Sequence, residues 1–181
     1  MSKKDIQLLN DHFVDENPIR VQIVTLSDRA SSGEYEDKSG PRLKGHLEGY
    51  FESNGLRYDA AIQVIPDDKD TLEKVLIDAR NSGVHAVFTT GGTGVGPRDI
   101  TPDVILKIAD KVIPGIMELV RYKYGADKPC ALLSRTVAAV LGSMIVYALP
   151  GSTKGVDEYM EEVMKSFDHV LCVLHELEVH T

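Results

Sequence analysis

One stretch of the sequence, residues 84–103, limits more than any other how this chain can fold. It begins with a short apolar run, residues 84–89, whose β-branched and aromatic side chains predict a buried parallel strand. Four glycines follow within six residues, so the backbone can turn tightly and its N–H groups stay open to a ligand. Thr101 and Pro102 then predict a helix start, with Thr101 as the N-cap. Strand, glycine loop and helix in this order are typical of an anion site at the carboxyl edge of an α/β sheet.

The glycine pattern matches neither of the two common phosphate-binding motifs. No lysine follows the glycines, as the phosphate loop requires. The spacing Gly-x-Gly-x-x-Gly fails at Pro97 when counted from Gly92 and at Asp99 when counted from Gly94. A tight turn without a ligand is the alternative for the glycines alone. Arg98 and Asp99 argue against that alternative, because a plain turn needs neither a cation nor a carboxylate at its exit.

Composition excludes several classes of protein. The chain has 181 residues, enough for one domain with a buried core, and its 43% hydrophobic and 27% charged residues indicate a globular protein. The formal net charge of −8 argues against binding to nucleic acid or to anionic membranes. A polyanionic ligand must therefore be held by a local cluster of cations, backbone N–H groups or a metal ion. No stretch resembles a signal peptide or a membrane span, so we expect a cytoplasmic protein.

Strands and helices are expected to alternate along the chain. Strands are predicted at residues 20–26, 56–65, 84–89, 136–140 and 143–149. Helices are predicted at residues 41–53, 71–82, 102–109, 116–124 and 154–177, the last with a break near Phe167. The predicted fold class is α/β: a single three-layer α/β/α domain with a mostly parallel sheet plus an antiparallel hairpin. Residues 1–18 are expected to form an N-terminal extension, poorly ordered or a short helix, and residues 19–178 the domain.

Polar clusters follow the predicted strands where each strand ends. Ser27, Asp28 and Arg29 follow the first strand, and Asp67 and Asp68 follow the second. The glycine loop follows the third, and residues 150–154 follow the last. Since the carboxyl ends of parallel strands share one edge of a sheet, we expect these clusters to meet there and to bind a ligand.

Single residues of these clusters leave alternatives open. Asp67 alone also fits a solvated turn acid after proline, and Asp99 alone fits a helix cap. Arg135 and Lys154 alone fit ordinary surface charges.

Three separate blocks of the sequence together resemble the signature of the molybdopterin adenylyltransferases. These are enzymes of molybdenum-cofactor synthesis that activate molybdopterin with ATP. The central block is Thr89-Thr90-Gly91-Gly92-Thr93-Gly94-x-x-x-Arg98-Asp99-x-Thr101-Pro102. The first block is Leu26-Ser27-Asp28-Arg29-Ala30-Ser31-Ser32-Gly33-x-Tyr35-x-Asp37-x-Ser39-Gly40. The third is Leu133-Ser134-Arg135 followed by Ala148-Leu149-Pro150-Gly151-Ser152-x-Lys154-Gly155. The resemblance extends from about Ile19 to near Leu177.

The resemblance implies adenylyl transfer, in which the terminal phosphate of molybdopterin attacks the α-phosphorus of ATP and pyrophosphate leaves. A phosphate nucleophile is already anionic near neutral pH, so the site needs positioning and charge neutralisation rather than a strong base. Asp67 and Asp99 match the two essential carboxylates of the family, and we expect them to be catalytic and to hold Mg²⁺.

The remaining implied site residues are expected to bind molybdopterin or ATP. They are Ser27, Asp28, Arg29, Thr90, Gly91, Gly92, Thr93, Gly94, Arg98, Ser134, Arg135, Pro150, Gly151, Ser152 and Lys154. The family is typically trimeric, so a homotrimer is implied, with apolar residues of the N-terminal extension and of residues 113–117 as candidate contacts. A molybdenum-insertion protein is a further implied partner.

Two alternatives to the enzyme remain. One is a related paralogue that binds molybdopterin without being the main adenylylating enzyme. The other is a non-catalytic scaffold with the same fold. The intact first block and the Arg98–Asp99 pair favour the enzyme over both.

Overall fold

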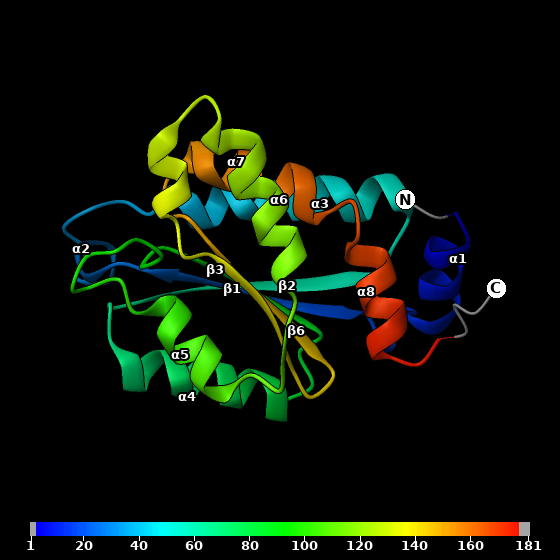
Figure 1. Cartoon of the computed structure of the whole chain (residues 1–181). Coiled ribbons are helices and arrows are strands. Elements are labelled where there is room, and N and C mark those ends of the chain that lie inside the picture. The colour runs from blue at the N-terminus through cyan, green and yellow to red at the C-terminus, as the bar shows by residue number, and fades with distance from the viewer. Residues whose placement is uncertain (1–2, 178–181) are drawn as a thin grey trace.

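A six-stranded sheet crosses the molecule and separates two layers of helices (Figure 1). The computed structural model describes residues 3–177. The strands stand in the order β2-β1-β3-β6-β5-β4. Their bounds are β1 Ile19–Leu26, β2 Tyr58–Ile65, β3 Ala86–Thr90, β4 Lys111–Val112, β5 Val137–Leu141 and β6 Met144–Leu149. The first four strands in the spatial order are parallel, whereas β5 runs antiparallel to β6 and β4 antiparallel to β5.

Each face of the sheet has its own apolar core. On one face lie α1 (Lys3–His12), α3 (Ser39–Asn54), α6 (Pro114–Gly125), α7 (Thr153–Val163) and α8 (Phe167–Leu174). On the other face lie α4 (Lys69–Asn81) and α5 (Thr101–Ile108). Two short elements, α2 (Asp28–Ser31) and the 3-10 helix η1 (Pro129–Leu133), complete the order. The predicted three-layer α/β/α fold with a hairpin is therefore confirmed.

The central strand β3 is buried on both faces, as its apolar sequence predicts. Phe88 belongs to one core and Val87 to the other, because successive side chains of a strand point to opposite faces. All five residues of β3 are buried between β1 and β6. The strand therefore holds the glycine loop on the most protected part of the sheet.

The pairing register brings four strand ends to one edge. Leu26 at the end of β1 pairs with Ile65 at the end of β2. Thr25 pairs with Thr90 at the end of β3, and Thr90 pairs with Leu149 at the end of β6. After β1 the chain continues to β2 on one side of the sheet, and after β3 it continues to β5 and β6 on the other side. The strand order therefore reverses between β1 and β3. Ligands of open α/β sheets bind at such a point.

The N-terminal segment is a helix that packs into the first core. Leu9 and Phe13 are fully buried, and the Phe13 ring contacts His85 at the start of β3 and His175 after α8. Of the two expectations for residues 1–18, the short helix is the one observed for residues 3–12. The expected domain ends at residue 178, which lies outside the described residues, and its limits stay an expectation.

Two local predictions differ from the structure. Lys111 and Val112, where no element was predicted, form the edge strand β4, which is too short to show a period in sequence. Thr101 is the first residue of α5 and not its cap; its hydroxyl donates instead to the carbonyl of Gly91, 2.9 Å away. A buried loop carbonyl thus competes successfully for the hydroxyl that sequence assigns to the helix end.

None of the helices within residues 3–177 has the length and apolar character needed to cross a membrane.

Candidate active site

The glycine loop is shaped by positions where a side chain does not fit. Gly91 and Gly92 have φ values of 103° and 63°, in the left-handed region that favours glycine. A Cβ at Gly91 would overlap the carbonyl oxygen of Leu26, and a Cβ at Gly92 would lie 2.6 Å from Thr101 Oγ1. The loop therefore presses directly on β1 and on the start of α5.

Asp99 is folded back over the same loop. Its Oδ2 accepts a hydrogen bond from the Gly96 N–H at 2.8 Å, and a Cβ at Gly94 would lie 2.6 Å from that oxygen. The carboxylate thus fixes the turn before the helix rather than capping the helix itself.

Arg135, which follows η1 in the chain, holds the glycine loop in place through hydrogen bonds to its carbonyl groups. Its Nε donates to the Gly94 carbonyl at 2.7 Å and its Nη2 to the Asp99 carbonyl at 2.5 Å. Both Nη atoms also bind the Asp103 carboxylate, at 2.8 and 3.0 Å, which lowers the pKa of Asp103. The Arg135 N–H donates to the Thr93 carbonyl at 2.8 Å. These contacts show a positioning role; a ligand contact of Arg135 stays a prediction.

Asp28 and Asp67 link the ends of β1 and β2. The Asp28 N–H donates to Asp67 Oδ2 and the Asp67 N–H donates to Asp28 Oδ1, each at 3.0 Å. Arg98 reaches from the glycine loop and binds Asp28 Oδ2. That hydrogen bond, followed by the one from the Asp67 backbone, lowers the pKa of Asp28.

Asp67 faces the glycine loop, since a Cβ at Gly92 would lie 3.6 Å from its Oδ1. Burial raises the pKa of Asp67, and the negative charges of Asp28 and Asp99 raise it further. Bringing a cation to this carboxylate would relieve both effects.

The carboxylates fit a metal ion that is shared with a substrate. Among residues 3–177, no group of three or more His, Cys, Asp and Glu side chains is arranged to hold an ion. Mg²⁺, however, is commonly bound by one or two carboxylates together with phosphate oxygens. Asp67 and Asp99 suit that arrangement, because the negative charge of Asp99 raises the pKa of Asp67. A bound cation would offset this repulsion between the two carboxylates.

A cavity of about 430 Å³ lies beside the β1 end, between the first turns of α3 and α7. Ser27, Gly151 and Ser152 line it, as expected for binding residues, together with Tyr35 and Lys38. Arg29 does not line it: its Nε pairs with Glu34 at 3.0 Å, and its guanidinium lies 5.3 Å from the centre of the Tyr35 ring.

Asp37 forms part of this cavity and is absent from the predicted site residues. Its Oδ2 accepts from Thr25 Oγ1 at 2.7 Å, and its Oδ1 accepts from the N–H groups of Ser39 and Gly40 at 3.0 and 3.1 Å. Asp37 therefore joins the end of β1 to the start of α3. The signal was present in the Asp37-x-Ser39-Gly40 spacing of the first block.

A second cavity, of about 290 Å³, lies between η1, the loop after β6 and α7. Ser134, Pro150 and Lys154 line it as expected, and Ser152 lines both cavities. Lys128 and Glu158, which form an ion pair in this second cavity, are missing from the prediction. Thirty positions separate them in the chain, and each alone has the sequence pattern of a solvated charge, so no signal marks them.

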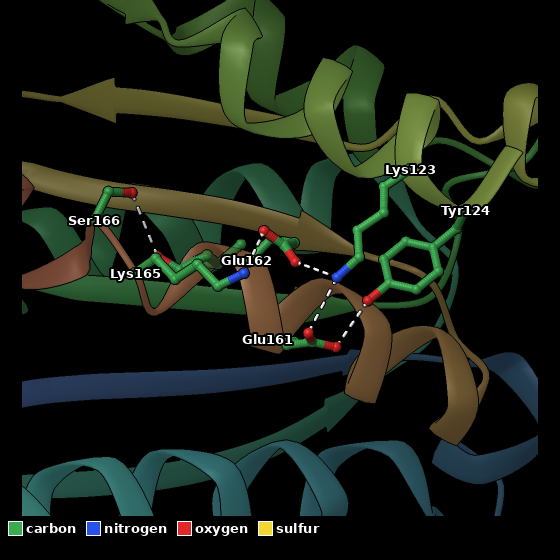
Figure 2. Close-up of polar contacts among 7 residues, drawn as sticks. Lys123, Tyr124, Glu161, Glu162, Lys165 and Ser166 are labelled. Atoms are coloured by element: carbon green, nitrogen blue, oxygen red, sulfur yellow. Dashed lines mark hydrogen bonds and ion pairs between the residues drawn. The ribbon is translucent and has the colours of Figure 1, made fainter. Parts of the chain in front are cut away.

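A network of charges holds α6 against α7 (Figure 2). Glu162, whose side chain is only 5% exposed, accepts from Lys123 at 2.6 Å and from Lys165 at 2.8 Å. Lys123 also binds Glu161 at 3.0 Å, and Tyr124 donates to Glu161 at 2.9 Å. The two lysines lower the pKa of Glu162.

The glycine loop and the cavities meet at the loop after β6. A Cβ at Gly151 would lie 3.2 Å from Gly91 Cα, and Thr90 Oγ1 donates to the Pro150 carbonyl at 2.8 Å. The structure thus brings the predicted residues together along one edge, with Arg29 directed to Glu34 instead. The edge offers backbone N–H groups, hydroxyls, cations and two carboxylates, a set suited to a phosphorylated ligand.

Known proteins share this architecture. The family model described as a probable molybdopterin binding domain matches residues 22–169. A molybdopterin adenylyltransferase of Escherichia coli K12 is 35% identical over 156 residues, which span 86% of this chain and 78% of the relative. One from Helicobacter pylori J99 is 36% identical over 152 residues, spanning 83% of this chain and 85% of the relative.

A solved structure of the molybdopterin biosynthesis enzyme MoaB from Thermus thermophilus matches with a TM-score of 0.77 and 34% identity, over 87% of this chain and 97% of that one. A MogA structure matches with a TM-score of 0.76 and 34% identity, over 86% and 99%. The resemblance seen in the sequence is confirmed. With its glycine loop, its fold and its relatives in agreement, the chain belongs to the molybdopterin-binding domain family of molybdenum-cofactor biosynthesis, which includes the molybdopterin adenylyltransferases.

Proposed function

We propose that this protein is a molybdopterin adenylyltransferase, which transfers AMP from ATP to the terminal phosphate of molybdopterin and releases pyrophosphate. The observation that carries the proposal is the placement of Asp67 and Asp99 against the glycine loop, at the point where the strand order reverses. Curated relatives at about one-third identity bear the name of this activity.

The site residues divide the work of positioning and neutralisation. The N–H groups of residues 92–94 bind phosphate oxygens, and Arg98 places a fixed positive charge beside them. The Gly91 N–H, which we also expected to bind phosphate, donates instead to the Leu149 carbonyl at 3.1 Å. An oxygen of the molybdopterin phosphate forms a bond to the α-phosphorus of ATP as the bond from that phosphorus to the bridging oxygen breaks, and pyrophosphate carries away the electron pair. Asp67 and Asp99 would hold Mg²⁺, which would neutralise part of the phosphate charge. No side chain needs to remove a proton.

The remaining polar residues of the edge serve binding. Ser27, Thr93, Ser134 and Ser152 supply hydroxyl groups for molybdopterin and ATP. The buried Thr90 hydroxyl donates to the Pro150 carbonyl and holds the loop after β6 in place. Lys154 adds positive charge, whereas Arg29 is paired with Glu34.

A homotrimer belongs to the same proposal, and of the contacts expected for it Val14 is exposed. Leu9, Phe13 and Met117 are buried within their own chain and are not available to a partner. Further exposed apolar side chains lie on α6 and η1: Leu119, Tyr122, Leu132 and Leu133. We place the subunit contact there, because exposed apolar patches mark association surfaces. We also propose that the protein acts in the cytoplasm and passes its product to a molybdenum-insertion protein.

The main rival is the paralogue that binds molybdopterin without adenylylating it. Both MogA and MoaB structures match this chain, so structural similarity alone favours neither branch, whereas the curated relatives cited above are named adenylyltransferases. A pure binding protein or a scaffold has no need for two carboxylates and a paired arginine around the glycine loop. That arrangement favours the enzyme.

The test is direct. The purified protein is mixed with molybdopterin and Mg²⁺-ATP, and a mass gain of one AMP on molybdopterin is expected. Asp99→Asn should still bind molybdopterin but lose adenylylation, whereas Asp59→Asn, an exposed acid on β2, should behave as the wild type. Binding without the mass gain would assign the chain to the paralogue, and no binding would refute the family's function here.

A further inference from the structure

Arg121, a half-buried residue of α6, binds the main chain between η1 and β5. Its Nη1 donates to the Thr136 carbonyl at 3.0 Å and, at the longer distance of 3.4 Å, to the Ser134 carbonyl. These two carbonyl groups stand on either side of Arg135 in the chain. One guanidinium group therefore fixes the backbone on both sides of Arg135.

The segment that Arg121 holds is the one that secures the glycine loop. The Arg135 N–H donates to the Thr93 carbonyl, and the Arg135 side chain donates to the carbonyls of Gly94 and Asp99. The place of the backbone at residues 134–136 therefore decides where these donors meet the loop. A continuous series of hydrogen bonds leads from α6 through this segment to the phosphate-binding edge.

Thr136 makes the first step of this series rigid. Its side chain is only 4% exposed, and its hydroxyl accepts from Arg121 Nη1 at 3.1 Å and donates to Tyr159 Oη on α7 at 3.0 Å. Hydrogen bonds from a charged donor are stronger than those between neutral groups. Loss of the guanidinium group would leave two main-chain carbonyls and one buried hydroxyl short of a donor, so we expect the segment to loosen.

We propose that Arg121 is a positioning residue: it holds residues 134–136 and, through Arg135, keeps the glycine loop in the geometry that AMP transfer requires. The effect on turnover rests on the proposed function, whereas the effect on the loop does not. In-line transfer between two phosphates depends on accurate placement, and a displacement of about 1 Å can lower a rate about a hundredfold.

The experiment removes the donors and keeps the length of the side chain. Arg121→Met is compared with the wild type by hydrogen exchange at the amides of Gly96, Asp99 and Arg135, which are hydrogen-bonded within or to the loop. We expect exchange about tenfold faster or more. In the AMP-transfer assay kcat should also fall by about tenfold or more, with a smaller change in KM for ATP, because exact alignment is needed only in the transition state.

A matched variant on the same helix separates positioning from general stability. Lys123→Met loses the bonds to Glu161 and Glu162 (Figure 2), so it should lower stability but leave kcat and exchange at the three amides unchanged. Arg121→Lys keeps a charged donor for the Thr136 carbonyl and should lie between Arg121→Met and the wild type. A merely structural role of α6 predicts instead that both methionine variants behave alike.

The outcomes separate this inference from the proposed function. Unchanged exchange at the three amides in Arg121→Met overturns the positioning role even if the stability falls, and so does faster exchange with a wild-type kcat. If the wild type transfers no AMP, the proposed function fails, and the exchange rates alone decide whether Arg121 holds the loop. If Arg121→Met does not fold, Arg121→Lys provides the same comparison, and unchanged exchange in that variant overturns the role.

Discussion

At the scale of single residues, Gly91 offers a clean test of the loop. Ala at this position must adopt a positive φ and overlap the Leu26 carbonyl, so we expect a loss of roughly 1–3 kcal/mol in the free energy of unfolding and loss of AMP transfer. Gly49, inside α3 with nothing within 4 Å of a Cβ, is the control. Gly49→Ala should gain about 0.5–1 kcal/mol. Urea unfolding of both variants measures the difference; equal stabilities would contradict the strained loop.

The imidazole of His85 makes the folding stability of the protein depend on pH in the acidic range. Its Nδ1 accepts from the Arg20 N–H at 2.8 Å, and burial, with the charges of His175, Arg20 and His12, lowers its pKa to about 4. Because the unfolded chain has the higher pKa, about 6.5, its stabilising contribution is complete above that pH and is lost as the pH falls toward 4.

Between pH 7 and pH 5, we expect the free energy of unfolding to fall by about 2 kcal/mol because of His85. His85→Asn keeps an acceptor for Arg20 but does not titrate, so its urea midpoint should fall less between these two pH values. Parallel curves for the variant and the wild type would exclude His85 as the cause.

Residue types were predictable at this scale, but residue partners were not. The sequence shows a threonine before a proline and places it at a helix cap, whereas the structure gives its hydroxyl to Gly91. The sequence also shows Arg135 in a family block without revealing that Gly94, Asp99 and Asp103 occupy its donors. Such partners depend on distances across the fold, which no local pattern contains.

At the scale of elements, the contact between α6 and α7 depends on Glu162. Glu162→Ala leaves Lys123 and Lys165 without their shared acceptor. Because both lysines are exposed, we expect a loss of about 1–2 kcal/mol rather than the larger cost of a fully buried pair. Lys165→Met should cost less, since Lys123 remains paired. Thermal unfolding of the two variants measures which loses more stability. An unchanged stability of Glu162→Ala would contradict the prediction.

The regular elements were predictable because their patterns extend over many residues. The strands and long helices follow apolar periods and end at glycine, proline or capping residues. β4 and α2 were missed because two and four residues hold too little periodicity. Their existence depends on neighbours: β5 pairs with β4, and the Ser27 hydroxyl caps α2.

At the scale of the whole molecule, α1 and the residues after α8 close the end of the sheet opposite the active site. Phe13 is buried between His85 and His175, with ring centres 4.9 and 5.4 Å away. Phe13→Ala should therefore lower stability by about 3–5 kcal/mol. AMP transfer at low temperature should persist, because the glycine loop lies at the other edge. Loss of transfer in folded protein would show that the two ends are coupled.

The overall site was predictable only in part. Convergence of the strand ends follows from strand order and parallel pairing, both implied by the alternation of elements. The second cavity was not predictable beyond its loop residues, because η1 and α7 meet there only after the helices pack. Lys128 and Glu158 therefore became visible only in three dimensions.

The sheet order also has a consequence for synthesis on the ribosome. β3 lies between β1 and β6, and the chain reaches β6 only at residues 144–149. Until then the newly made β3 has one open edge, and Arg135, which fastens the glycine loop, has only just been added. A nascent chain with an open central strand is exposed to wrong pairing. The first two thirds of the chain therefore remain prone to aggregation until the last third has been synthesised and β6 has paired with β3.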